Sequence, residues 1–122
     1  MTSNRKPSSV FISYARTDAP KVKRILKSLI AKGLIKDEEA IFKEEDLQVR
    51  HKSLRQEVRN RIESASKLVV IWDKASANSQ WVNYEVGLAD ALGKPIIAVV
   101  PEKVPFPNHL QHVQIVRIPS ET

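Results

Sequence analysis

Two short apolar runs constrain the fold of this chain most strongly. Leu68–Trp72 and Pro95–Val100 are apolar at nearly every position. A strand with one solvated face alternates apolar and polar residues, whereas a near-continuous apolar run is typical of a strand that is buried on both faces. The sequence therefore predicts a sheet whose central strands are covered from both sides.

Segments with helical periodicity separate the predicted strands. In residues 18–32, apolar side chains recur at helical spacing with lysines between them. Thr17 or Asp18 can cap the start of this helix, and Gly33 suits its end. Three helices are predicted in all, at residues 18–32, 53–65 and about 80–92.

The order of these elements predicts the class of fold. Strands are expected at residues 10–14, 40–42, 68–72, 95–100 and 113–118, and loops at 43–52 and 76–79. Strands that alternate with helices build a parallel sheet with right-handed crossovers. We therefore predict an α/β, flavodoxin-like fold with five parallel strands and helices on both faces. Ligands of such sheets bind beyond the carboxyl ends of the strands.

Length and composition indicate one cytoplasmic domain. The chain has 122 residues, which suits a single core, and no cysteine. Residues 1–8 are polar and are expected to be a flexible leader before a domain at 9–122. No apolar run approaches the roughly 20 residues that span a bilayer, so no membrane partner is expected.

The net charge of +6 is unevenly placed. Residues 16–36 and 50–61 are basic, and residues 37–46 are acidic. Solvated outer faces of helices are the favoured explanation, and attraction of an anionic partner is the alternative. Aromatic residues are not interleaved with the basic stretches, which disfavours nucleic acid as a partner.

Several catalytic motifs are missing from the sequence. The three glycines form neither a phosphate-binding loop nor a dinucleotide fingerprint. The histidines lack partners at metal-binding spacing, so no metal site is predicted. Asp73 follows a central strand, where a phosphate-accepting aspartate could lie, but its acidic and lysine partners are not evident from the sequence.

The segment that begins at Ser79 carries a more informative pair. Ser79 can cap the third helix, and Trp81 and Glu85 lie four residues apart, so they share one face of that helix. An indole beside a carboxylate could hold a flat ring next to a charge-stabilising group. The alternatives are a core aromatic residue and an ordinary helix carboxylate in a salt bridge.

Three motifs in register give the chain a family resemblance. They are Phe11–Arg16 (FISYAR), Leu68–Trp72 (LVVIW), and Ser79–Glu85 (SQWVNYE) leading to Gly93–Ile97 (GKPII). In this order the chain resembles the TIR (Toll/interleukin-1 receptor) domain family, particularly its bacterial branch, over about residues 9–118. The resemblance implies a flavodoxin-like fold.

The resemblance also implies an activity. Many TIR domains cleave NAD at the nicotinamide–ribose bond and release linear, cyclic or base-exchanged ADP-ribose, and NAD is then a substrate with no further cofactor. Glu85 matches the family's essential acidic residue. The matching residues of the NAD-binding site are Ser13, Tyr14, Ala15, Arg16, Asp46 and Trp81, with Asp46 in the mobile loop that gates the pocket.

Two other functions remain open at this point. Many family members act only after self-association, and the chain could be a non-catalytic module that associates with other TIR domains. The basic first helix and the acidic residues 37–46 would then be complementary faces. Nucleic-acid binding through the basic helices is a third, weaker alternative.

Overall fold

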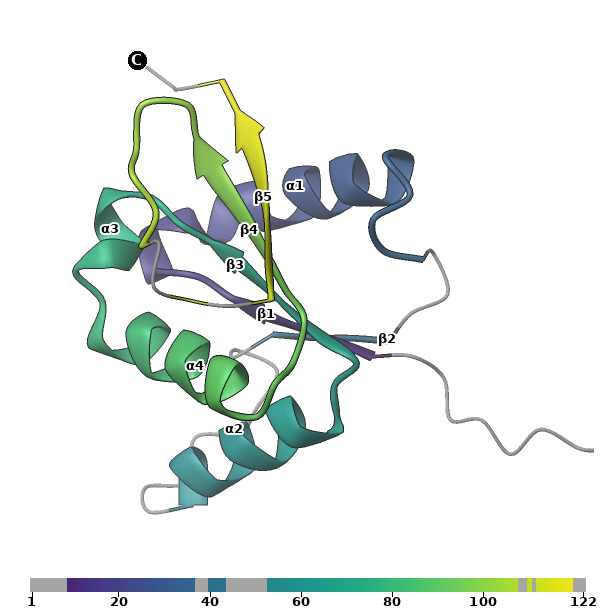
Figure 1. Ribbon diagram of the computed structural model, residues 1–122, viewed down its shortest axis with the longest axis vertical. Coiled ribbons are helices and arrows are strands. Elements are labelled where there is room, and N and C mark those ends of the chain that lie inside the picture. The colour runs from purple at the N-terminus through teal and green to yellow at the C-terminus, as the bar shows by residue number, and fades with distance from the viewer. Residues whose placement is uncertain (1–8, 37–39, 44–52, 108–109, 111, 120–122) are drawn as a thin grey trace, which may run out of the picture.

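One parallel sheet organises the part of the chain that the structure describes. The computed structural model describes residues 9–36, 40–43, 53–107, 110 and 112–119. The sheet has five strands in the order β2-β1-β3-β4-β5, and every neighbouring pair is parallel (Figure 1). Its strands are β1 (Ser9–Ser13), β2 (Ala40–Lys43), β3 (Lys67–Ile71), β4 (Ile96–Pro101) and β5 (Val113–Ile118). The predicted α/β class and flavodoxin-like parallel sheet are confirmed.

Helices cover both faces of this sheet. One face carries α1, whereas α2 and α4 lie on the other (Figure 1). The helical elements are η1 (Arg16–Asp18), α1 (Ala19–Ala31), α2 (Ser53–Ser64), α3 (Lys74–Ala77) and α4 (Gln80–Ala91). Because apolar layers lie on both sides, the central strands are apolar at nearly every position, as the sequence predicted.

Strand alternation assigns each side chain of β3 and its extension to one face. Leu68, Val70 and Trp72 pack in the cluster under α2 and α4. Val69 and Ile71 pack in the cluster under α1. Successive side chains of a strand point to opposite faces, so the side chain of Asp73 lies on the α1 face. By the same alternation in β1, Phe11 and residue 13 face α4.

The ends of the helices follow the expected sequence signals. Ser79 caps α4, and its hydroxyl accepts a hydrogen bond from Val82 N over 3.1 Å. Gly33 and Gly93 follow the ends of α1 and α4 with φ of 74° and 71°. A positive φ is costly for a residue with a Cβ atom, which explains the two glycines.

The short helix α3 differs from the sequence-based prediction of a loop at residues 76–79. Asp73 and Ser76 form a capping box: Ser76 N donates to Asp73 Oδ1 over 3.0 Å, and Asp73 N donates to Ser76 Oγ over 3.3 Å. These reciprocal bonds satisfy backbone groups that a helix start would otherwise leave free. They therefore stabilise the single turn of α3, whose residues lack the apolar periodicity that predicts a helix.

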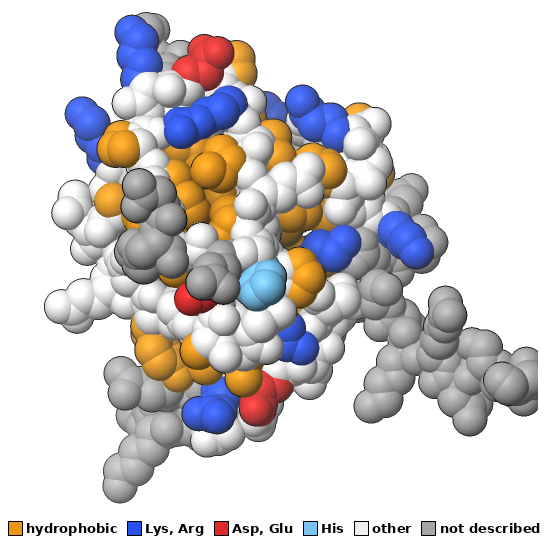
Figure 2. Space-filling view, in the orientation of Figure 1, with side chains coloured by type: hydrophobic (Ala, Val, Ile, Leu, Met, Phe, Trp, Pro, Cys, Tyr) orange, Lys and Arg blue, Asp and Glu red, His pale blue; other side chains and the backbone are white. Residues whose placement is uncertain are grey.

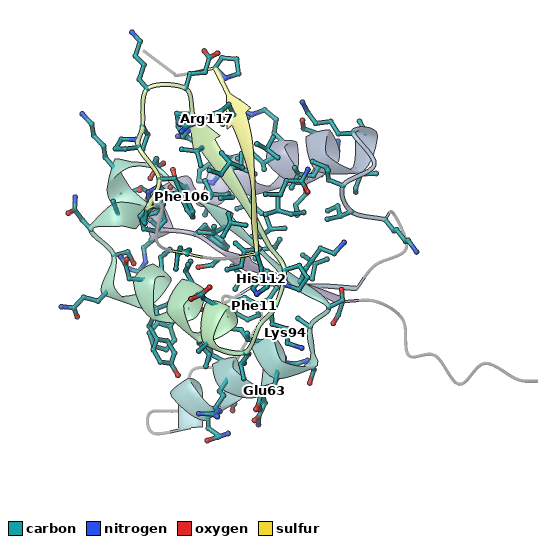
Figure 3. All side chains as sticks on the ribbon, viewed as in Figure 1. Phe11, Glu63, Lys94, Phe106, His112 and Arg117 are labelled. Atoms are coloured by element: carbon teal, nitrogen blue, oxygen red, sulfur yellow. The ribbon has the colours of Figure 1, made fainter. Side chains whose placement is uncertain are left out.

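Side-chain contacts tie the connecting segments to the sheet and helices. The rings of Trp72 and Phe106 meet edge to face, with centroids 5.4 Å apart. Phe106 is labelled in Figure 3. Lys94 Nζ donates to the carbonyl oxygen of Glu63 over 2.8 Å, which joins the residues after α4 to α2. These contacts hold the loops at both ends of β4 close to the α4 face.

The surface agrees with the prediction of solvated basic faces. Lys23, Arg24 and Lys27 of α1 are exposed. On the face shown in Figure 2, the basic side chains are dispersed around an apolar area and form no single patch. Within the described ranges, no helix has the length and apolar character needed to cross a bilayer.

Candidate active site

A short buried hydrogen bond joins two of the motifs that the sequence singled out. Ser13, the last residue of β1, donates its hydroxyl to Glu85 Oε1 over 2.6 Å. Both residues are 0% exposed. Bonds from a hydroxyl to a carboxylate typically have this length and are stronger than bonds between neutral groups. The contact fixes Glu85 at the carboxyl end of β1.

The fold explains why this carboxylate lies inside the protein. Glu85 belongs to the buried face of α4, with Val82, Val86 and Ala89. A glutamate is rarely fully buried unless it is paired, because its desolvation is costly. Position 85 would suit an apolar residue by packing alone, so the carboxylate with its serine partner marks a candidate functional group.

Trp81 lies one turn before Glu85, as its spacing predicted. The indole is half-buried and stacks on Tyr84, with ring centroids 5.4 Å apart and an angle of 21° between the planes. Its Nε1 atom is buried and finds no hydrogen-bond acceptor in the described part of the chain. Buried indole N–H groups usually have an acceptor. The group is therefore available to an additional partner.

The other predicted site residues have different environments. Tyr14 and Ala15 are buried, at 7% and 8% exposure. Arg16 begins the turn η1 and is exposed. Asp46 lies outside the described residues. The structure thus places Ser13 against Glu85, whereas Arg16 remains at the surface.

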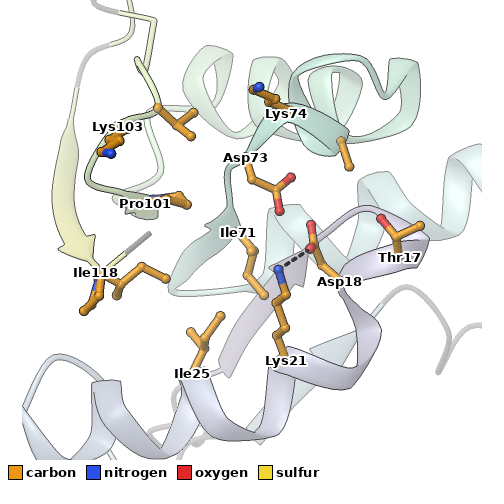
Figure 4. A pocket seen from close by; sticks show the side chains of 13 residues that line it. Thr17, Asp18, Lys21, Ile25, Ile71, Asp73, Lys74, Pro101, Lys103 and Ile118 are labelled. Carbon is orange, nitrogen blue, oxygen red and sulfur yellow. Dashed lines mark ion pairs between the residues drawn. The ribbon is translucent and has the colours of Figure 1, made fainter. Parts of the chain in front are cut away.

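A cleft opens on the opposite face of the sheet, beside α1. Its volume is about 580 Å³, and it lies at the carboxyl ends of β3, β4 and β5. Ile25, Ile71 and Ile118 form apolar walls, and Asp18, Lys21 and Asp73 are polar lining residues (Figure 4). Neither Glu85 nor Arg16 lines this cleft. It occupies the edge where open parallel sheets bind ligands.

Two carboxyl groups meet in this cleft and perturb one another. Burial, followed by a hydrogen bond and charge repulsion from Asp73, raises the pKa of Asp18 from 3.8 to about 6, although Lys21 opposes the shift. Burial alone would raise the pKa of Asp73, but hydrogen bonds with Asp18 and Ser76 and the charge of Lys21 outweigh it and lower this pKa. Lys21 Nζ lies 3.4 Å from Asp18 Oδ1.

Sequence reasoning missed this cluster for a local reason. Asp18 precedes a helix, so the sequence predicts only that it can cap that helix. It does occupy the N-cap position, but its side chain makes no capping hydrogen bond and lines the cleft instead. The acidic and lysine partners that Asp73 lacked in the sequence are Asp18 and Lys21. Asp18 and Lys21 lie three residues apart at the start of the helix after β1, and this spacing could have indicated the cluster from the sequence.

Comparison with known proteins identifies the family. A family model described as TIR domain matches residues 10–121. The chain therefore belongs to the TIR domain family, as its motifs indicated. No protein with a curated description matches the sequence significantly.

Solved structures share the fold at low sequence identity. The TIR domains of the activated Roq1 resistosome, which recognises the pathogen effector XopQ, align with a TM-score of 0.59 and 23% identity over 78% of this chain. The chain spans 58% of that protein's length. The CMP N-glycosidase BcmB of Clostridium botulinum aligns at 0.62 and 16% identity, over 93% of this chain and 91% of its own. A 2-deoxyribosyltransferase from Leishmania mexicana aligns at 0.54 and 13%, over 77% and 65%.

Proposed function

We propose that this TIR domain is an NAD⁺ glycohydrolase or cyclase that cleaves the nicotinamide–ribose bond in a cytoplasmic immune or stress response. The observation that carries the proposal is the buried hydrogen bond between Ser13 and Glu85, which joins the first-strand motif to the family's acidic residue. Family membership supports it. Two of the similar structures are, by name, an N-glycosidase and a deoxyribosyltransferase.

The chemistry of the bond accounts for a carboxylate in the site. When the bond between ribose C1′ and nicotinamide breaks, nicotinamide leaves with the electron pair and the ribose becomes an oxocarbenium-like cation. A carboxylate held in a water-poor site stabilises such a charge more strongly than it would in water. Water then adds at C1′ and releases a proton to give ADP-ribose, or a group of the same molecule adds to give a cyclic product. The Ser13 hydroxyl orients Glu85 for this role.

Binding of NAD⁺ requires a change around Glu85. The residue is 0% exposed, so substrate reaches it only when the side chains over it separate. Trp81 lies beside it with a buried N–H that lacks an acceptor among the described residues. This donor and the flat indole surface suit a ring of the dinucleotide. Self-association of the domain would complete the site and favour the open arrangement.

A direct assay tests the proposal. Concentrated protein is incubated with NAD⁺, with and without a crowding agent, and nicotinamide and ADP-ribose products are separated by chromatography. We expect Glu85→Gln to lower the rate by about a hundredfold or more. Glu63→Gln is the matched control, because Glu63 is an exposed carboxylate paired with Arg59 at 3.8 Å. Equal rates for the wild type and Glu85→Gln would refute the catalytic role.

The complete burial of Glu85 favours a second candidate function, a non-catalytic module that associates with other TIR domains. A buried Ser13–Glu85 pair would then serve only to position α4 against β1. The exposed lysines of α1 would face an acidic surface of a neighbouring copy. Salt-sensitive self-association in analytical ultracentrifugation, without NAD⁺ turnover at any concentration, would support this module over the enzyme.

A further inference from the structure

The carboxyl groups of Asp18 and Asp73 point toward one another at the cleft beside α1 (Figure 4). We propose that this pair binds a divalent cation of the hard, oxygen-preferring class, such as Mg²⁺ or Mn²⁺. The site is separate from the Ser13–Glu85 pair, because the two lie on opposite faces of the sheet. The inference therefore goes beyond the proposed NAD⁺ chemistry and does not depend on it.

Asp73 is a fixed ligand in this arrangement. Its Oδ1 atom accepts the backbone N–H of Ser76 over 3.0 Å, and its own N–H donates to Ser76 Oγ over 3.3 Å. These bonds anchor the carboxylate directly after β3. A side chain that is already held in place loses little conformational entropy when it binds an ion.

Asp18 provides the observation that points to a ligand. The residue is 3% exposed, and its Oδ1 atom lies 3.4 Å from Lys21 Nζ. Its Oδ2 atom is buried and, when both carboxyl groups are ionised, has no hydrogen-bond donor within the described residues. A buried carboxylate oxygen without a partner is costly, and a bound cation removes that cost. The same side chain lines the cleft, so an ion can reach it.

The number of protein ligands fits a hydrated ion. The described residues contain no group of three or more histidine or acidic side chains that could enclose a metal. Mg²⁺ loses its water reluctantly and is commonly held by one or two carboxylates, with water at the other positions. The cleft volume of about 580 Å³ leaves room for those waters. Two carboxylates without thiolate or imidazole also select hard cations.

The surrounding charges make binding sensitive to Lys21. The cleft is lined by Lys21 from α1, Lys74 from α3 and Lys103 from the loop after β4. Lys21 contacts a proposed ligand directly, because its Nζ atom lies 3.4 Å from Asp18 Oδ1. Its positive charge opposes a bound cation, so its removal should raise the affinity.

Titration of the purified chain with Mn²⁺ tests the site, with calorimetry and water-proton relaxation as readouts. We expect one Mn²⁺ per chain. Asp73→Asn and Asp18→Asn should each weaken binding at least about tenfold, because each removes a charged ligand. Lys21→Met should strengthen binding, because it removes a competing positive charge. Glu63→Gln, an exposed carboxylate outside the cleft, should change nothing.

Several results would overturn the site. They are the absence of Mn²⁺ binding at millimolar concentrations, or equal affinity in Asp18→Asn and Glu63→Gln. Binding of inorganic phosphate in place of Mn²⁺ would show that the lysines make the cleft an anion site, and it would also overturn the cation site. If Asp73→Asn does not fold, the affinities of Asp18→Asn and Lys21→Met decide the question. Glu85→Gln should bind Mn²⁺ normally whether or not it cleaves NAD⁺.

Discussion

Replacing Ser13 with alanine tests how strongly the buried carboxylate depends on its partner. The change removes the hydroxyl that donates to Glu85 Oε1 over 2.6 Å. Both residues are 0% exposed, so bulk water does not take the place of the lost donor in the folded state. Alanine keeps the Cβ atom and removes one oxygen, so lost packing contributes little.

The expected loss follows from the charge and burial of the acceptor. Hydrogen bonds to charged groups contribute about 1.5–3 kcal/mol, and the upper part of this range applies where the acceptor is buried. We therefore expect Ser13→Ala to lower the free energy of unfolding by about 2–3 kcal/mol. For a chain of 122 residues, 1 kcal/mol corresponds to about 4 °C in the melting temperature. The midpoint should fall by about 8–12 °C.

Ser66→Ala is the matched control. The Ser66 hydroxyl donates to the backbone oxygen of Ser9 over the same 2.6 Å, but Ser66 is exposed and its acceptor is neutral. Water can replace this bond, so we expect a loss below about 1 kcal/mol. Urea denaturation followed by tryptophan fluorescence and circular dichroism measures both variants under the same conditions.

A double-mutant cycle with Glu85→Gln isolates the interaction itself. The coupling energy between positions 13 and 85 should be at least about 1 kcal/mol, because the two side chains are in direct contact. A Ser13→Ala loss no larger than that of Ser66→Ala, or a coupling near zero, would show that the hydrogen bond does not hold the carboxylate in solution.

Three further predictions address the cleft, the helix ends and the core. The pKa of Asp18, about 6 in the folded chain against 3.8 ordinarily, adds stability that is complete below about pH 4 and is lost as the pH rises through about 6. In urea titrations, stability relative to Asp18→Asn should therefore fall by up to about 3 kcal/mol between about pH 4 and about pH 7.5, and a constant difference would contradict this. Gly93→Ala should lower the melting temperature by about 4 °C or more, because the φ of 71° is costly for alanine although no atom blocks the Cβ position. Gly87→Ala, inside α4, should instead raise the melting temperature by about 2–4 °C. Melting temperatures that change in the same direction in both variants would refute the backbone explanation. Leu29→Ala, at 1% exposure under α1, should cost about 2–5 kcal/mol in urea denaturation, and a loss below about 1 kcal/mol would show that this part of the core is not tightly packed.

The fold was predictable because its signals are local. Burial on both faces makes β3 and β4 apolar at nearly every position, and Gly33 and Gly93 mark the ends of α1 and α4. Each of these features is a property of a few consecutive residues. Their order along the chain then defines the parallel sheet, because strands that alternate with helices have few other arrangements.

The sites were less predictable because they join distant residues. Ser13 and Glu85 are 72 positions apart, and the family resemblance implies only that both belong to the NAD site, without a contact between them. Asp18 and Asp73 meet because α1 packs beneath β3, and neither position carries a local pattern that indicates the other. The helix α3 depends on a capping box rather than on apolar periodicity.

Strand alternation keeps the two polar centres of this domain apart. In β1 and beyond β3, alternate positions face opposite sides, so Ser13 points toward α4 whereas Asp73 points toward the cleft beside α1. A substitution in one centre therefore leaves the ligands of the other in place. If NAD⁺ turnover is lost in Glu85→Gln but retained in Asp73→Asn, the chemistry belongs to the α4 face. If the reverse is observed, the cleft is the catalytic centre, and the Ser13–Glu85 pair serves to hold α4 against β1.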